Sequence, residues 1–164
     1  MVRRELPPCL IICFLLLAFI AAVFALPGCS SRSDDDIVLN VQECADKLLE
    51  TIAFKDTLTE INEQAITTIY HIAAEDVLEK KVYVSTGATA EEIAVFEAID
   101  HDAAKRVEAA VWQRVDKQKV GFRDYLPKEL PKLKDPIVLV KGNYVIFCVS
   151  DHKEEVEAEL KKLF

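Results

Sequence analysis

The triplet Asp100-His101-Asp102 places an imidazole between two carboxylates, a combination that could bind a metal ion or transfer protons. A protein metal site draws on several convergent ligands, usually three or more. Carboxylates at the start of a helix instead accept hydrogen bonds from free backbone N–H groups and interact favourably with the helix dipole. Since His71 and His152 lie far away in the sequence, we interpret the triplet as a helix cap and predict no metal site and no cofactor.

Nucleophile and phosphate-binding patterns are missing from the sequence. There is no G-x-S-x-G elbow, no C-x-x-C pair and, with four glycines in all, no glycine-rich phosphate loop. Ser85-Thr86-Gly87, close to Glu91 and Glu92, could form the rim of a small-ligand site, but a turn that requires a positive φ at Gly87 is the favoured interpretation. We therefore predict no catalytic residue and favour a non-enzymatic function.

A binding surface is the best-supported candidate site. Arg114 and Gln118 lie near the end of a predicted helix, and Tyr125 and Glu129 follow in a proline-containing stretch. Tyr and Arg are common anchors of interfaces. The alternative, which we favour, is structural: Arg114 would bond the carbonyls of the loop and Tyr125 would cover the edge of the core.

The N-terminal 28 residues have the order of a secretory signal. Arg3 and Arg4 precede seventeen uncharged, largely apolar residues, 10–26, and the run ends in Leu26-Pro27-Gly28-Cys29. This ending resembles the bacterial lipobox, in which the cysteine thiol receives a diacylglycerol before cleavage leaves cysteine first. We predict a lipoprotein signal peptide over 1–28 with lipid attachment at Cys29; the alternative is an uncut membrane anchor.

The remainder of the chain divides into a tether and a domain. Residues 29–37 are Ser/Asp-rich and are predicted to be a flexible linker, and residues 38–164 a single domain. The chain carries 20 basic and 28 acidic residues, a formal net charge of −8, which argues against nucleic acid as a partner. The predicted location is the extracytoplasmic face of the cell membrane.

Hydrophobic periodicity predicts helices and strands in an α+β order. Asn40 is a predicted N-cap, and either Asp100 or Asp102 is predicted to cap the helix that follows it. Gly142-Asn143 is a two-residue hairpin turn between strands that are apolar on both faces. The predicted helices are Val41–Ala53, one turn at Glu75–Glu79, Asp100–Lys119 and Asp151–Phe164, the last with an Asp151/Glu154 capping box. The predicted strands are Ala65–Ile72, Lys80–Gly87, a partner strand around Ile93–Phe96, and the two strands of the Gly142-Asn143 hairpin. Residues Pro127–Pro136 are predicted to form a loop. The expected fold is a single antiparallel sheet of four or five strands with long helices packed on it.

Two of the five cysteines, Cys44 and Cys148, lie in the predicted domain, one on a helix stripe and one in a strand. Both are predicted to be small buried hydrophobic residues. An exported compartment would permit a disulfide between them, but we favour two unpaired thiols.

The stretch from Ser85 to Glu97, S-T-G-A-T-A-E-E-I-A-V-F-E, and the run from Arg114 to Tyr144 together carry a family resemblance. The chain resembles an uncharacterised family of bacterial lipoproteins, a domain of unknown function common in Gram-positive bacteria, over about Val38 to Val149. The resemblance implies a location and a fold and carries no known chemistry.

These observations lead to one functional hypothesis with two alternatives. The chain is expected to be a lipid-anchored extracytoplasmic module that binds a protein of the envelope or a small ligand. The first alternative is an envelope hydrolase or redox accessory protein, with His101 or Cys148 open to a pocket of titratable groups. The second is a subunit of a membrane complex.

Overall fold

The computed structural model describes residues 37–164, which form an α+β structure built on one antiparallel sheet. The predicted signal peptide, Cys29 and nearly all of the predicted linker lie outside these residues. The strands are β1 (Thr59–Glu60), β2 (Val77–Val84), β3 (Glu92–Ala98), β4 (Ile137–Lys141) and β5 (Tyr144–Val149), in the order β1-β2-β3-β5-β4. This arrangement confirms the predicted fold class and sheet.

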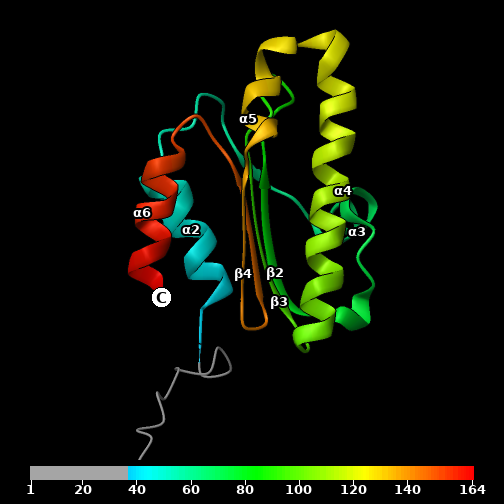
Figure 1. The fold of residues 1–164 in the computed structure, drawn as a ribbon, viewed down its shortest axis with the longest axis vertical. Coiled ribbons are helices and arrows are strands. Elements are labelled where there is room, and N and C mark those ends of the chain that lie inside the picture. Colours follow the sequence, from blue (N-terminus) through cyan, green and yellow to red (C-terminus); the bar gives the residue numbers. More distant parts are fainter. Residues whose placement is uncertain (1–36) are drawn as a thin grey trace, which may run out of the picture. The chain divides into compact units, whose positions relative to one another are not determined.

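Helices cover both faces of the sheet (Figure 1). On one face lie α2 (Val41–Thr51) and α6 (Lys153–Leu163), and on the other lie α3 (Glu63–Tyr70), α4 (His101–Tyr125) and the short α5 (Leu130–Lys134). Strands β2 to β5 therefore contribute to two cores. In β3, Ile93 and Val95 pack towards α2, whereas Ala94 and Phe96 pack towards α4, as expected for side chains that alternate across a sheet.

The helix caps show why two of the long helices begin where the sequence predicts. The Asn40 side chain accepts a hydrogen bond from the N–H of Glu43 at 2.9 Å, and Asp100 accepts one from the N–H of Ala103 at 2.7 Å. These side chains satisfy backbone donors that have no partner inside the helix. The apolar stripe of α4 is buried as predicted, and the helix continues six residues further than predicted, to Tyr125.

The predicted strand Ala65–Ile72 is wrong, because residues Glu63–Tyr70 form helix α3. Asn62 caps it by accepting a hydrogen bond from the N–H of Ala65, and Ile66 and Tyr70, one turn apart, are its buried residues. The two β-branched threonines that suggested a strand are exposed, and their hydroxyls bond carbonyls four residues earlier in the helix. His71 consequently ends a helix in the left-handed conformation, with φ of 56°.

The predicted loop Pro127–Pro136 is also partly helical. A 3-10 turn, η3 (Pro127–Glu129), leads directly into α5, and a proline lies in the first turn of each. Proline is tolerated there because its missing N–H would have no partner in that turn. The helical turn predicted at Glu75–Glu79 is instead a 3-10 turn, η2 (Ala74–Asp76), after which β2 begins at Val77.

The start of α6 differs from the predicted capping box. His152 is the N-cap residue and its side chain makes no capping bond, while the Ser150 hydroxyl accepts a hydrogen bond from the His152 N–H at 2.9 Å. Asp151 does not cap the helix. Its carboxylate forms ion pairs with Lys55 and Lys132 instead.

Both predicted hairpins are present. Strands β4 and β5 pair from Lys141–Tyr144 to Ile137–Cys148 around Gly142, whose φ is 56°, and Asn143. A positive φ at the first residue of a two-residue loop matches the twist of the flanking strands. In the connection between β2 and β3, Gly87 has a φ of 96°, which is the conformation predicted for that turn.

Candidate functional site

Two adjacent carboxylates at the start of β3 lie in opposite cores. Glu91 and Glu92 are each 1% exposed. Because neighbouring side chains of a strand point to opposite faces, Glu92 lies on the side of α4, and Glu91 on the other side, near the segment that precedes β1. Buried carboxylates require charged or hydrogen-bonding partners, and each of these two has its own set.

The Glu92 carboxylate accepts hydrogen bonds from three side chains. Arg114 approaches it with Nη2 at 2.8 Å and Nε at 3.2 Å, and Gln118 donates from Nε2 at 2.7 Å. The hydroxyl of Tyr70 also donates to Glu92. Arg114 and Gln118 are four residues apart on α4, so one face of that helix presents both donors to β3.

The electrostatics of this cluster favour a charged Arg114 and a neutral Tyr70. Burial opposes the charge on the Arg114 guanidinium, but the carboxylate of Glu92 outweighs it and raises the Arg114 pKa above its ordinary value. Burial, together with the negative charge of Glu92, raises the Tyr70 pKa well above its ordinary value. Tyr70 therefore remains a hydrogen-bond donor, and it packs edge-on against Phe96 with ring centroids 5.2 Å apart.

One buried polar atom of the cluster has no partner. Gln118 is 7% exposed, and while its Nε2 bonds Glu92, its Oε1 makes no hydrogen bond. A buried acceptor without a donor costs about 1–3 kcal/mol. Among the residues that the structure describes, this is the one buried side-chain polar atom without a partner.

Gln118 lines a cavity of about 340 Å³, which lies within the size range of small-molecule sites. Arg114 and Gln118 supply polar groups, and Lys117 and Tyr125 are exposed residues of the lining. The other lining residues are Ile69, Val84 and Phe122, which are apolar, together with Ser85, Gly87, Thr89, Glu92 and Gly121. The cavity thus combines an apolar wall with a few convergent polar groups.

Three of the four residues predicted to form a binding surface therefore line one cavity. Arg114 does not bond loop carbonyls, the structural alternative, because its guanidinium is paired with Glu92. Tyr125 does not cover the edge of the core, since it is 71% exposed. Glu129 is not part of the cavity: it is 4% exposed, accepts a hydrogen bond from the Ala90 N–H and pairs with Lys132.

Glu129 belongs to a second buried cluster, centred on the ammonium of Lys132. The Lys132 Nζ lies 2.8 Å from Glu129, 3.1 Å from Asp151 and 3.5 Å from Glu91. Glu91 in turn accepts hydrogen bonds from the backbone N–H groups of Lys55 and Asp56. Because every carboxylate here has donors, the cluster connects loops rather than offering free groups to a ligand.

Sequence reasoning missed Glu92 and Tyr70 as partners of Arg114. The sequence indicates Glu92 only as a neighbour of a polar turn that could form the rim of a small-ligand site, and it predicts Tyr70 in a strand. Alternation along β3 carried a usable signal, because Glu92 shares a face with Ala94 and Phe96 and so had to be buried. A buried glutamate requires a cationic or donor partner, and Arg114 lies on the helix that covers that face.

The remaining sequence candidates are scattered. Asp100 caps α4 as predicted, Asp102 pairs with Lys105, and His101 is exposed at the first residue of the helix. Within residues 37–164, no group of three or more His, Cys, Asp or Glu side chains is arranged to hold a metal ion.

Cys44 and Cys148 are free, buried thiols in the core beneath α2, as predicted. Burial raises the Cys44 pKa to about 12 and also raises that of Cys148, so both stay protonated. Within the described part of the chain, no helix has the length and apolar character needed to cross a membrane.

Comparisons with known proteins identify the domain. No curated protein and no solved structure gives a match. A family model described as a domain of unknown function, DUF4358, matches residues 50–150, which include β1 to β5 and both Glu91 and Glu92. The match spans more than half of the chain, and the protein belongs to the DUF4358 family.

Proposed function

We propose that this protein is a non-enzymatic binding module whose cavity beside α4 takes a small polar molecule. The unpartnered Oε1 of buried Gln118 carries the proposal, since Nε2 of the same amide is committed to Glu92. Oε1 itself is not accessible in the structure, so a ligand that presents an N–H or O–H group would supply the missing donor once the amide turns towards the cavity. Sites built to bond such a group reject analogues that lack it, because a buried polar atom is then left unpaired.

The lining of the cavity indicates the chemical class of the ligand. Lys117 at the rim provides an ammonium group for an anion, while Phe122 and Ile69 provide apolar contacts. Arg114 is neutralised by Glu92 and therefore adds little net charge. A small hydroxy acid, amino acid or amide-bearing carboxylate would satisfy these groups within about 340 Å³.

The positions of the candidate catalytic groups support binding over hydrolysis or redox chemistry. That alternative required His101 or Cys148 to open into a pocket with titratable groups. His101 lies at the start of α4, about four turns before Arg114, and Cys148 is 2% exposed on the opposite face of the sheet. Neither residue lines the cavity.

Ligand-detected NMR tests the proposal on the full-length chain in detergent micelles. The probe is a mixture of small hydroxy acids, amino acids and amide-bearing carboxylates, with the corresponding alkyl carboxylates as competitors that lack a donor. We expect saturation-transfer signals from the donors and a loss of affinity of at least about tenfold in Gln118→Leu. The matched control is Gln113→Leu, an exposed glutamine of the same helix outside the cavity; equal binding by the two variants would contradict the proposal.

We further propose that the module is anchored to the extracytoplasmic face of the cell membrane by lipid on Cys29, as in a bacterial lipoprotein family of Gram-positive organisms. The support is the charged start, the apolar run and the Leu26-Pro27-Gly28-Cys29 ending. Metabolic labelling with palmitate should mark the wild-type chain and not Cys29→Ala. Retention of the label in Cys29→Ala would exclude lipidation at this residue.

A further inference from the structure

Strand β4 is an edge of the sheet, and half of its backbone groups point away from β5. The Ala98 N–H donates to the Asn143 carbonyl, so these two residues form a hydrogen-bonded pair between β3 and β5. Since every second residue of a strand bonds the same neighbour, the backbone groups of Val145, Phe147 and Val149 bond β3. The other β5 residues must bond β4, through Ile137, Leu139 and Lys141. The N–H and C=O groups of Val138 and Val140 therefore face outward.

These outward groups have no partner elsewhere in the described chain. Neither valine takes part in a backbone hydrogen bond to a turn, loop or cap within residues 37–164. An edge strand with free backbone groups is a template for another strand. Peptides bind such edges by adding a strand, with main-chain bonds giving affinity and side-chain pockets giving specificity.

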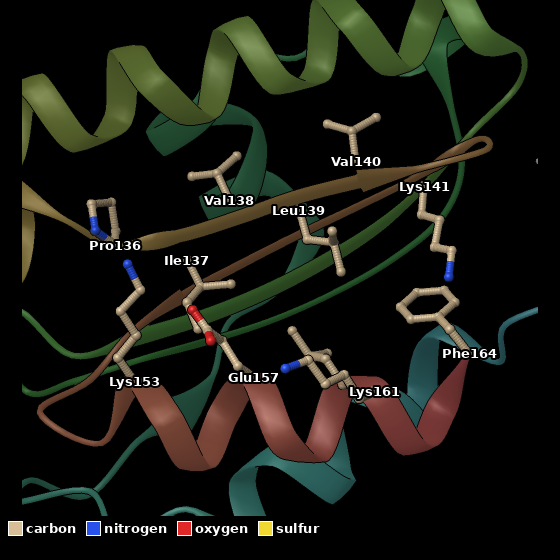
Figure 2. A pocket seen from close by; sticks show the side chains of 11 residues that line it. Pro136, Ile137, Val138, Leu139, Val140, Lys141, Lys153, Glu157, Lys161 and Phe164 are labelled. Carbon is tan, nitrogen blue, oxygen red and sulfur yellow. The ribbon is translucent and has the colours of Figure 1, made fainter.

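A groove runs along this edge between β4 and α6 (Figure 2). Its volume is about 680 Å³, and all five residues of β4 line it, with Leu160 and Phe164 on the α6 side. In Figure 2, Ile137 and Leu139 point towards α6, whereas Val138 and Val140 point towards α4. An added strand would therefore find apolar side chains on both faces of β4.

The groove is basic although the chain is acidic. Lys141, Lys153 and Lys161 line it together with one acidic side chain, that of Glu157, in a chain whose formal net charge is −8. Lys153 is paired with Asp135, while Lys141 lies 4.5 Å from the centre of the Phe164 ring. Lys161 has no ion-pair partner among residues 37–164. The charge of the groove thus favours an acidic occupant.

We propose that this groove binds an extended, acidic segment of a partner polypeptide, which pairs with β4 as an additional strand. Its backbone bonds the outward groups of Val138 and Val140. Side chains on one face of the added strand are apolar and pack beside Val138 and Val140. Side chains on its other face are carboxylates and point towards the lysines beside α6. A second copy of this chain is a poorer occupant, since its own β4 would bring lysines against lysines and β4 carries no acidic residue.

Two pools of labelled nine-residue peptides test the proposal by fluorescence anisotropy with the full-length chain in detergent micelles. In one pool, Val, Ile or Thr alternates with Asp or Glu; in the other, the same apolar residues alternate with Lys or Arg. We expect the acidic pool to bind at least about tenfold more tightly than the basic pool. Raising the NaCl concentration from about 0.05 to 0.5 M should weaken that binding, because salt screens the charges of the groove lysines.

Variants of the two recognition elements locate the binding. Val140→Pro removes an outward N–H, a change that edge strands tolerate, and Lys161→Glu reverses a groove charge. Each should weaken binding of the acidic pool at least about fivefold. The matched controls are Val38→Pro, at an exposed position before α2, and Lys128→Glu, on an exposed lysine outside the groove. Circular dichroism checks that each variant is folded, and Lys161→Glu, which leaves the backbone unchanged, tests the proposal if Val140→Pro unfolds.

Equal affinity for the two pools, or binding that neither variant alters, would overturn the proposal. Analytical ultracentrifugation measures whether the chain associates with itself. Self-association that Val140→Pro abolishes, without binding of either pool, would assign the edge to a second copy of the chain and would also overturn it. Neither outcome bears on the cavity beside α4, which lies on the other face of the sheet and shares no lining residue with the groove.

Discussion

The carboxylate of Glu92 is the common acceptor of the polar side chains on the α4 side of the sheet. Arg114, Gln118 and Tyr70 all donate to it, and it is almost completely buried. Taking two charges out of water is costly, and their attraction offsets that cost only when the geometry is good and the remaining sites are bonded. Breaking such a pair is therefore more damaging than replacing both partners.

Replacement of Arg114 should show how much the fold loses when this buried ion pair is broken. Arg114→Met leaves the Glu92 charge buried without its cation, and we expect a loss of about 3–5 kcal/mol in the free energy of unfolding. Adding Glu92→Gln in the same chain should restore at least about 1 kcal/mol, since the unpaired charge is then gone. Urea denaturation followed by circular dichroism measures both quantities.

The control is Lys105→Met, which breaks an exposed ion pair with Asp102 on the same helix. Such surface pairs contribute about 0–1 kcal/mol. If the double variant were no more stable than Arg114→Met alone, the two side chains would not be energetically coupled and the interpretation of the cluster would be wrong.

At the scale of elements, local signals determined those helices and turns whose residues have the same preference alone as they show in the fold. Asn40 and Asp100 are good caps followed by apolar stripes, and Gly142-Asn143 is a good hairpin turn. Helix α3 was missed because its threonines and isoleucines favour strands when considered alone. Its helical state depends on the burial of Ile66 and Tyr70 against the sheet, which propensity does not include.

Two glycines should respond in opposite directions to replacement by alanine. Gly121 lies within α4, and a Cβ there would meet no atom within 4 Å, so Gly121→Ala should stabilise the protein by about 0.5–1 kcal/mol. Gly87 also has open space, but its φ of 96° strains any other residue. Gly87→Ala should destabilise the protein by about 1–2 kcal/mol. Thermal unfolding of the two variants provides the measurement, and stabilisation by both would show that the β2–β3 turn does not need its positive φ.

At the scale of the whole molecule, the Lys132 cluster connects segments that are far apart in the sequence. Lys132 follows η3, Glu129 bonds the backbone of Ala90 before β3, and Asp151 follows β5 and also pairs with Lys55. Burial opposes ionisation of Glu129 and Asp151, but hydrogen bonds from Lys132, and for Asp151 also from Lys55, lower the pKa of both carboxyl groups. Their ionised forms therefore favour the folded state.

The sign of these shifts predicts acid sensitivity. A carboxyl whose pKa is lower in the folded than in the unfolded chain stabilises the fold above the unfolded value, about 4, and loses that contribution as the pH falls through the folded value. The free energy of unfolding should thus fall between about pH 5 and pH 2. Glu129→Gln keeps an acceptor for the Ala90 N–H but removes the titrating group, so its difference from wild type should be largest at pH 7 and shrink in acid.

Urea denaturation at pH 7, 5 and 3 measures that difference. Glu108→Gln, on α4 and outside the Lys132 cluster, is the matched control and should follow the wild-type pH dependence. A difference between Glu129→Gln and wild type that stays constant with pH would show that Glu129 does not act through its charge.

The sequence by itself determined the α+β class, both hairpins and the starts of α2 and α4, because these depend on periodicity, caps and turn residues within a short window. It also singled out Arg114, Gln118 and Tyr125. Only the tertiary structure showed that these three share a cavity, that Glu129 belongs to a different cluster, and that Glu91 and Glu92 lie in opposite cores. The partners of a buried charge come from segments distant in the chain, and which segments meet is decided by how the helices pack on the two faces of the sheet.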